Sequence, residues 1–463
     1  MAQCDPAMSF EECELAILRH AVDEAEKIQS KTIIENPQIK KIIRIVEDFL
    51  KKRKLVCYGG TAINNLLPAK QQFYDKTLEL PDYDFYSDTP VEDAKLLADT
   101  YYSNGFTDVE AKAGVHHGTY KVFVNFMPIA DITYLSPPIF SSVKEQAVEK
   151  KGILYAPVNF LRMSMYLELS RPGGDVSRWE KVLKRLILLN QRYPLKPKHC
   201  NRVSVQRPFE SKEDKTVIFN SVRESVAKHK GVFFGGYAAI LYSQYMPEKL
   251  QRKIRNTPDF DVLSEEPEVL SQEVKEKLER EGMENVMIYE HEGIGELIAP
   301  HYEVVVGKET VVFIYEPIAC HSYNTVDSEG LTLRIASIDT MLSFYLAFLY
   351  SGRSYYDKER IICMAKYLFD VQHNNRLKQK GLLRRFSMEC YGKQQTIINL
   401  REQKAEMYKK LKGKKGTREY QEWFLNYSPR LEKEREISRK KRNATRTPRG
   451  LKLLRNKTRK KKN

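Results

Sequence analysis

Two stretches decide the fold: LVCYGGTAINNLL at Leu55–Leu67 and PDYDFYS at Pro81–Ser87. In the first stretch, an apolar run typical of a β-strand leads into two glycines and then into a segment with helical spacing. The second stretch places two aspartates on either side of a tyrosine, in a run whose aromatic residues are typical of a strand. Strand, Gly-Gly, helix and a second strand with Asp-x-Asp together predict an α/β unit that carries a polar site.

The same order of features occurs a second time along the chain. GVFFGGYAAILYS at Gly231–Ser243 is followed by PDFDVLS at Pro258–Ser264. Each copy continues with a β-rich stretch, and we expect a helix opening with Leu-Arg to follow it, at residues 161–162 and at 333–334. An internal repeat of this length indicates a duplicated domain. The predicted fold class is therefore α/β (α+β), with two tandem duplicated domains, helical additions and a disordered basic C-terminal tail.

Composition shifts and prolines suggest where these parts begin and end. The 463-residue length also favours at least two domains. We predict six parts: an N-terminal helical segment at 1–50, a catalytic domain with a helical extension at 51–192, a linker at 193–211, a second, degenerate domain with helices at 212–390, a C-terminal helical region at 391–437 and a basic tail at 438–463.

The net charge and the cysteines indicate what kind of partner the protein binds and in which redox compartment it is found. The formal net charge is +16, and 13 of the 26 residues from Ser438 to Asn463 are Lys or Arg. Such a tail is either an electrostatic arm for nucleic acid or a solubilising or localising end. The seven cysteines show no close metal-binding or redox spacing. No signal peptide and no membrane-length apolar run is visible, so we expect an intracellular, reducing location and no membrane partner.

Asp82 and Asp84 form the candidate catalytic and metal-binding pair. Residues two apart in a strand point to the same face, so both carboxylates project together. Carboxylates this close repel one another by roughly 4 kcal/mol at an effective dielectric near 20, which favours a bound cation. Asp131, in the strand-like run PIADITYL, is the candidate third ligand. Three carboxylates can hold two divalent ions that clamp an in-line phosphoryl transfer.

The glycines and a basic helix are the candidate nucleotide-binding elements. Gly59 and Gly60 allow the backbone to approach a phosphate closely, and the helix that follows offers N–H groups to an anion. In the helical segment SRWEKVLKRL, the residues Arg178, Lys181 and Arg185 form a basic stripe separate from the apolar one. We predict that Lys181, with Arg178, neutralises a triphosphate. The alternative interpretation is a solvated charged face.

The second copy lacks one of the three carboxylates. It retains Asp259 and Asp261, but alignment of the two copies puts Phe313 opposite Asp131. Glu303 or Glu316 is the alternative source of a third ligand. We expect this copy to serve as a scaffold or an RNA-holding module rather than as a catalyst.

The motifs resemble those of a known family. GGTAIN, DYDFYS and RPGGDVSRWEKVLKRL at Arg171–Leu186 resemble the poly(A) polymerases of poxviruses and other large nucleocytoplasmic DNA viruses, within the DNA polymerase β-like nucleotidyltransferase superfamily. The resemblance implies ATP as substrate, Mg²⁺ or Mn²⁺ as cofactor, and metal ligation by Asp82, Asp84 and Asp131. Many relatives carry Gly-Ser where this chain has Gly59-Gly60, so we expect Thr61 to supply the hydroxyl contact to the nucleotide.

The function predicted from these observations is template-independent addition of AMP from ATP to the 3′ end of mRNA, with release of pyrophosphate. The alternatives are another template-independent nucleotidyltransferase, such as a uridylyltransferase, or a non-catalytic RNA-binding pseudo-transferase. The resemblance further implies either a homodimer or a viral processivity subunit, and a location in the host cytoplasm and the virion.

Overall fold

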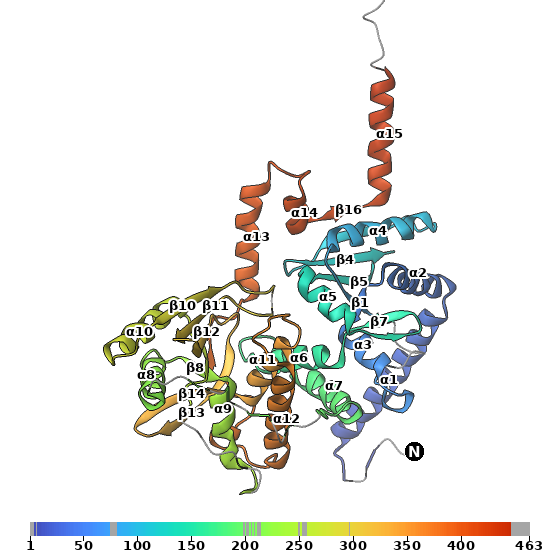
Figure 1. Ribbon diagram of the computed structural model, residues 1–463. Coiled ribbons are helices and arrows are strands. Elements are labelled where there is room, and N and C mark those ends of the chain that lie inside the picture. Colours follow the sequence, from blue (N-terminus) through green and yellow to red (C-terminus); the bar gives the residue numbers. More distant parts are fainter. Residues whose placement is uncertain are drawn as a thin grey trace, which may run out of the picture. The chain divides into compact units, whose positions relative to one another are not determined.

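The computed structural model describes residues 4–445, except for 6, 75–80, 198–199, 201–202, 205, 208, 211–213, 249–250, 252–256 and 296. Contacts within the chain define two compact units, each assembled from segments far apart in sequence. Unit 1 consists of Met1–Arg53, Asp75–Tyr134 and Lys404–Asn463, and unit 2 of Lys54–Tyr74 and Leu135–Gln403. Helices and strands alternate in both, so the predicted α/β class is confirmed (Figure 1). The six-part division predicted above stays a prediction.

Unit 1 is built on strands in the order β16-β3-β4-β5-β2. The bounds are β2 (Tyr83–Ser87), β3 (Val109–Ala113), β4 (Thr119–Val124), β5 (Met127–Tyr134) and β16 (Asn426–Tyr427). β2 and β5 are parallel, and the other neighbours are antiparallel. The edge strand β16 comes from a region that we predicted to be helical only, and it pairs with β3 through Tyr427 and Ala111.

One face of this sheet is apolar and covered by helices. Tyr83 and Phe85 of β2 are buried, as are Ala130 and Ile132 of β5. Helices α4 (Pro90–Ser103) and α2 (Pro37–Arg53) pack against it. The apolar spacing of α2 buries Ile39, Ile42, Val46, Phe49 and Leu50, as expected for an amphipathic helix.

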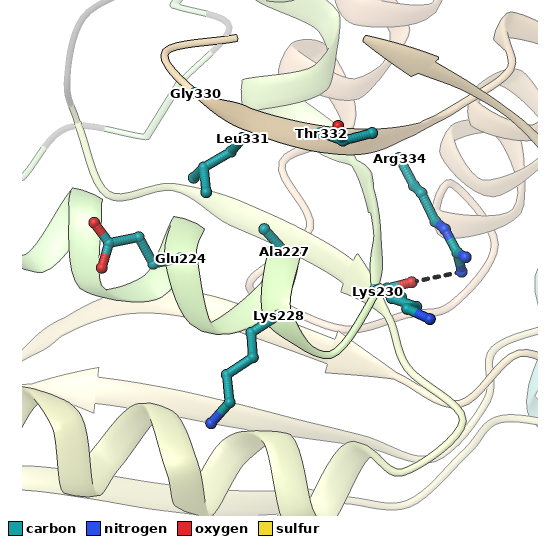
Figure 2. A pocket seen from close by; sticks show the side chains of 9 residues that line it. Glu224, Ala227, Lys228, Lys230, Gly330, Leu331, Thr332 and Arg334 are labelled. Carbon is teal, nitrogen blue, oxygen red and sulfur yellow. Dashed lines mark hydrogen bonds between the residues drawn. The ribbon is translucent and has the colours of Figure 1, made fainter. Parts of the chain in front are cut away.

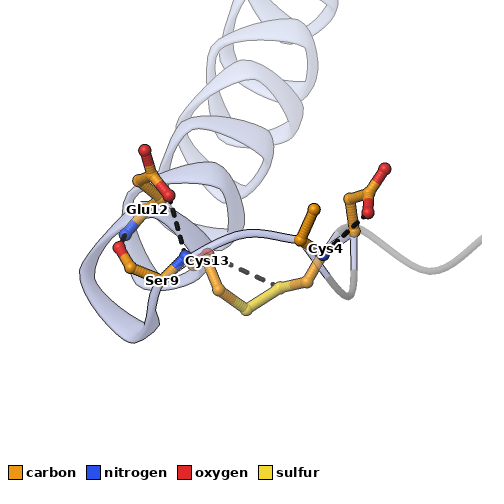
Figure 3. The surroundings of a disulfide bond; sticks show 6 residues. Cys4, Ser9, Glu12 and Cys13 are labelled. Carbon is orange, nitrogen blue, oxygen red and sulfur yellow. Dashed lines mark hydrogen bonds between the residues drawn. A yellow bond between two sulfur atoms is a disulfide. The ribbon is translucent and has the colours of Figure 1, made fainter.

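The helical N-terminus that we predicted is present in unit 1. Helix α1 (Phe10–Glu35) precedes α2 and opens with a reciprocal capping pair, in which Ser9 and Glu12 each accept a hydrogen bond from the other's backbone N–H (Figure 3). This arrangement satisfies two N–H groups at the start of the helix. A disulfide between Cys4 and Cys13 closes the same turn.

Unit 2 contains the first Gly-Gly motif and its helices. Strands run in the order β1-β7-β6, with bounds β1 (Val56–Tyr58), β6 (Val148–Lys150) and β7 (Ile153–Tyr155). β1 and β7 are parallel. The helices associated with them are α3 (Gly59–Leu66), α5 (Pro137–Glu145), α6 (Val158–Leu169) and α7 (Trp179–Arg192).

The rest of unit 2 is an eight-stranded sheet in the order β10-β11-β12-β9-β8-β14-β13-β15. Its strands are β8 (Val232–Phe234), β9 (Phe260–Leu263), β10 (Val286–His291), β11 (His301–Val306), β12 (Glu309–Tyr315), β13 (His321–Ser328), β14 (Leu331–Ala336) and β15 (Cys390–Tyr391). The order β10-β11-β12-β9 repeats β3-β4-β5-β2, and β8-β14-β13 repeats β1-β7-β6. Both copies also share their parallel pairs, so the duplication is confirmed.

The structure corrects one detail of the repeat. Leu161-Arg162 lies in helix α6, whereas Leu333-Arg334 lies in strand β14. The counterpart of α6 is α11 (Ile338–Phe348), because each helix directly follows the strand that runs parallel to the Gly-Gly strand. The shared dipeptide was therefore coincidental. Every residue of α11 is buried, and the helix packs against α6 and α12 (Lys358–Asn374).

Helices complete both units. In unit 2 they are α8 (Lys215–Lys228), α9 (Gly235–Leu241) and α10 (Pro267–Arg280), and near the C-terminus follow α13 (Ile397–Leu411), α14 (Arg418–Phe424) and α15 (Pro429–Thr445). Helix α15 extends to Thr445, so the first residues of the stretch predicted to be a disordered tail are helical. Residues 446–463 lie outside the described part of the chain.

The cysteines form bonds that their spacing did not predict. Besides Cys4–Cys13, the pairs Cys200–Cys363 and Cys320–Cys390 are disulfide-bonded, while Cys57 is a buried thiol outside these disulfides. Pairing of this kind cannot be deduced from sequence because it depends on which distant segments meet in the fold. Disulfides are rare in reducing compartments, but the compartment itself stays a prediction. In the described residues, no helix is long and apolar enough to cross a membrane.

Candidate active site

The centre of the candidate site is a row of charged residues across three neighbouring strands of unit 1. The parallel register of β2 and β5 places Asp84 beside Asp131, and the antiparallel register of β5 and β4 places Lys121 beside Asp131. Register partners point to the same face of a sheet. Their strand neighbours Tyr83, Ala130 and Val122 are buried on the opposite face. The two carboxylates therefore share the half-buried, polar face, as the sequence predicted for each residue separately.

Electrostatics requires a cation in this row. Neighbouring strands lie about 4.8 Å apart, so two ionised carboxylates there repel one another by roughly 3 kcal/mol at an effective dielectric near 20. Lys121 provides positive charge: its Nζ lies 2.5 Å from Oδ2 of Asp131. The lysine side chain is 38% exposed and that of Asp131 20% exposed. This contact could not be read from the sequence, because it depends on the register of the β4–β5 hairpin.

Asp82 is placed differently from the other two carboxylates. It lies just before β2 and is exposed. In the ranges that the structure describes, no group of three or more His, Cys, Asp or Glu side chains lies close enough together to hold a metal ion. The structure thus brings Asp84 and Asp131 side by side and does not gather Asp82 with them. The three-carboxylate metal site stays a prediction.

The Gly-Gly motif adopts the turn that it requires. Gly59 has φ = 70°, a left-handed conformation that favours glycine. At Gly60, a Cβ atom would collide with the hydroxyl of Tyr74 and would lie 3.1 Å from the guanidinium of Arg185. The backbone at Gly60 is therefore approached closely by a polar and a cationic group, and Thr61 is buried in the first turn of α3.

The cation beside the glycines is not one that we predicted. Arg185 of α7 donates a hydrogen bond to Tyr74 Oη at 2.7 Å, and its guanidinium lies 4.9 Å from the centre of the Phe73 ring. Arg178 instead pairs with Glu168 at 3.2 Å, and Lys181 is exposed on α7. Arg185 lies two helical turns after Arg178 on the basic stripe that the sequence indicated, but we had not predicted that it contacts the nucleotide.

The equivalent positions in the second copy confirm the alignment made from sequence. The β9–β12 register pairs Asp261 with Phe313, as β2 and β5 pair Asp84 with Asp131. On the next strand Glu303 takes the position of Lys121, and it accepts hydrogen bonds from Thr310 and interacts with His291 at 2.8 Å. The charges of the first copy are thus replaced by an apolar ring and an acidic residue.

Two arginines neutralise the remaining carboxylates of the second copy. Asp259, which is fully buried, contacts the guanidinium of Arg207 and lies 2.8 Å from Nη2 of Arg360. Burial alone raises the pKa of Asp259, but Arg207 and Arg360 outweigh it, and the pKa lies below its usual value. Asp261 lies against Gly235, and burial raises its pKa to about 6. Removing one partner of such a buried arginine–carboxylate cluster is strongly destabilising, because it leaves an uncompensated buried charge.

A separate cavity of about 420 Å³ opens in unit 2, between α8 and β14 (Figure 2). Its charged lining comes from Glu224, Lys228, Lys230 and Arg334, and Nη1 of Arg334 donates to the backbone oxygen of Lys230 at 3.0 Å. No predicted site residue contributes to the lining. This cavity is therefore distinct from the candidate active site.

The fold and the site together define a class of protein. A strand–Gly-Gly–helix motif, an Asp-x-Asp strand parallel to a third carboxylate-bearing strand, and a second copy of the same topology define a tandem nucleotidyltransferase-like fold. Residues 44–175 match the family model "Poly(A) polymerase catalytic subunit". This range contains Gly59–Thr61, Asp82, Asp84 and Asp131 and ends before Arg178.

Known proteins of large DNA viruses resemble the chain in sequence. One is described as "Putative poly(A) polymerase catalytic subunit" of Acanthamoeba polyphaga mimivirus, with 33% identity over 183 residues, which is 39% of this chain and 30% of that protein. The protein of the same description from African swine fever virus (isolate Tick/Malawi/Lil 20-1/1983) is 31% identical over 197 residues, covering 41% of this chain and 40% of that protein. The alignments thus span less than half of these relatives.

A solved structure resembles the chain over most of its length. The crystal structure of the Megavirus polyadenylate synthase aligns with a TM-score of 0.75 and 21% identity, covering 92% of this chain and 87% of that one. At this level of identity the likeness shows the fold. The chain is therefore similar to viral poly(A) polymerase catalytic subunits in sequence over its first copy and has the fold of a viral polyadenylate synthase.

Proposed function

We propose that the protein is a template-independent polynucleotide adenylyltransferase that adds AMP from ATP to the 3′ end of RNA and releases pyrophosphate. The observation that carries the proposal is the register of Asp84 with Asp131, on the polar face of a sheet and inside the range that matches the poly(A) polymerase family. Residues of the second copy, where Phe313 replaces the aspartate, have a supporting role in this proposal.

The residues present fit a divalent ion. Two adjacent carboxylates are hard oxygen ligands of the kind that Mg²⁺ and Mn²⁺ prefer, and the ion pair of Lys121 with Asp131 supports the proposal that a cation is favourable here. Asp84 and Asp131, with Asp82, would hold Mg²⁺ or Mn²⁺. The bound ions would lower the pKa of the attacking 3′-hydroxyl and offset charge on the triphosphate.

The remaining predicted residues would bind and orient the nucleotide. The glycine turn at Gly59-Gly60 allows backbone N–H groups at the start of α3 to approach phosphate oxygens, and the Thr61 hydroxyl lies in the same turn. Arg185 and Lys181 of α7, with Arg178 just before that helix, would offset the negative charge of the triphosphate. Holding the reactants in line contributes most of the rate in phosphoryl transfer of this type.

The partners in this proposal follow from the chemistry and from the relatives. The substrates are an RNA 3′ end and ATP. The name "catalytic subunit" of the relatives implies a further subunit in those proteins, and for this chain we propose either such a processivity subunit or a second copy of itself. A location in the host cytoplasm, and in the virion, is part of the same proposal.

The direct test is extension of a short RNA. The purified full-length chain is incubated with 5′-labelled oligonucleotide, Mg²⁺ or Mn²⁺, and one nucleoside triphosphate at a time. ATP should give a ladder of products, and a primer ending in a 3′-deoxynucleotide should give none, since it lacks the attacking hydroxyl. Preferential use of UTP would replace adenylyl with uridylyl transfer. Failure with all four triphosphates and both metals would support the non-catalytic RNA-binding alternative.

A further inference from the structure

The two copies neutralise their strand carboxylates in different ways. In the first copy Asp131 makes one ion pair, with Lys121, whose side chain is 38% exposed. In the second copy Asp259 is fully buried and contacts two guanidinium groups, those of Arg207 and Arg360, which are 23% and 17% exposed. The cation that pairs with Asp131 is thus accessible, whereas the two that pair with Asp259 are enclosed.

The two kinds of cation differ in how readily they leave. A lysine ammonium is a compact charge on a flexible stem and makes one contact at a time, whereas a guanidinium presents a fixed set of donors. Arg207 additionally donates its backbone N–H to Asp259 at 2.7 Å, so it cannot move away without displacing the chain. Lys121 can rotate into solvent without disturbing β4, because its neighbours Tyr120 and Val122 anchor the strand on the other face.

We propose that Lys121 is an exchangeable internal cation: it positions Asp131 and offsets the charge of the carboxylate row until a divalent ion binds, and it then gives up its place. This role rests on the proposed function, since it concerns the same carboxylates. Lys121 is accordingly a positioning residue that competes with the metal. The second copy, with its enclosed arginines, does not exchange its cations and does not bind the metal.

The proposal predicts in which direction two substitutions of Lys121 change the affinity for Mn²⁺. Lys121→Met removes the competing charge, so Mn²⁺ should bind at least tenfold more tightly. The metal-free variant should unfold at a lower temperature than the wild type, because Asp131 loses its ion pair with Lys121. Lys121→Arg retains the charge and strengthens the contact with Asp131, so Mn²⁺ should bind more weakly than to the wild type. A residue with a merely structural role would weaken binding in both variants.

Lys112 provides a matched control. It is the register partner of Lys121 on the next strand, β3, and it pairs with Glu110 at 2.5 Å with comparable exposure. Because it does not contact the aspartates, Lys112→Met should leave Mn²⁺ affinity within twofold of the wild type.

The experiment measures Mn²⁺ binding to the full-length protein without nucleotide or RNA, from the electron paramagnetic resonance signal of free Mn²⁺. Wild type, Lys121→Met, Lys121→Arg, Lys112→Met and Asp84→Asn are compared, and thermal unfolding in EDTA verifies that each is folded.

Tighter Mn²⁺ binding in Lys121→Met and weaker Mn²⁺ binding in Lys121→Arg support the exchange. Unchanged or weaker binding in Lys121→Met overturns it, while the proposed function stands. If Lys121→Met does not fold, the Arg variant decides alone. If the wild type binds Mn²⁺ no better than Asp84→Asn, the metal site of the proposed function and the exchange both fail.

Discussion

Removal of Arg360 should destabilise the second copy without affecting chemistry in the first. Arg360 lies 2.8 Å from a carboxylate oxygen of Asp259, which has no exposed surface. At this distance the Coulomb attraction is about 6 kcal/mol at an effective dielectric near 20, and the cost of burying both charges offsets part of it. Loss of one partner from such a cluster typically costs about 3–5 kcal/mol, since a buried charge is left under-neutralised. We expect a loss of this size in Arg360→Met.

Differential scanning calorimetry of the full-length chain measures this loss. Lys184→Met is the matched control, because Lys184 pairs with Glu180 in a contact that is 72% and 79% exposed, and such exposed pairs contribute little to stability. RNA extension at a temperature where both variants are folded should remain near the wild-type rate. A destabilisation below about 1 kcal/mol would refute the view that the arginines are essential to the fold of the second copy. A loss of extension in the folded variant would refute the assignment of chemistry to the first copy.

Three further predictions concern other parts of the chain. His321 is fully buried, and burial lowers its pKa to about 3. As the pH falls below about 6.5 the unfolded state binds a proton that the folded state does not, so stability should decrease by roughly 3 kcal/mol at pH 4.5. His321→Phe should therefore shift the midpoint of acid unfolding, followed by circular dichroism, to lower pH, and an unchanged midpoint would argue against this role. Gly60→Ala should displace Tyr74 and Arg185 from the glycine turn and weaken ATP binding at least tenfold in equilibrium dialysis. If the variant bound ATP as tightly as the wild type, this turn would not be part of the nucleotide-binding site. Deletion of Ser438–Asn463 should reduce the salt dependence of RNA binding. If the tail makes roughly five phosphate contacts, the slope of log affinity against log salt that it contributes is about −3.5. Fluorescence anisotropy of a labelled RNA measures this slope, and an unchanged slope after the deletion would favour a localising or solubilising role for the tail.

The sequence predicted those parts of the site that depend on residues close together in the chain, through strand alternation and the order of the motifs. Strand alternation put Asp84 on the polar face, and the apolar run around Asp131 marked it as a strand residue. Comparison of the two copies predicted that Phe313 replaces Asp131, and the register confirms this. Each of these inferences needed only the side-chain period of a strand and the order of motifs.

The parts that could not be predicted depend on contacts between distant segments. The pairing of Lys121 with Asp131 follows from a hairpin register, and the pairing of Arg360 with Asp259 joins residues that are 101 positions apart. Strand β16 pairs with β3 across most of the chain length, and its two-residue span leaves no periodic signal. We predicted a helix at Leu333-Arg334 because the two copies share this dipeptide. A shared dipeptide is weaker evidence than strand pairing, which places these residues in β14.

The central claim is that the carboxylates of the first copy, and not those of the second, carry the adenylyl transfer. Asp84→Asn and Asp261→Asn remove the same charge at equivalent positions of the two copies. The measurement is single-nucleotide addition to a labelled RNA at saturating ATP, with thermal unfolding to verify that both variants are folded. Asp84→Asn should reduce the rate by at least 100-fold, about 2.7 kcal/mol of transition-state stabilisation, and Asp261→Asn by less than about twofold. Equal losses, or a larger loss in Asp261→Asn, would contradict the account.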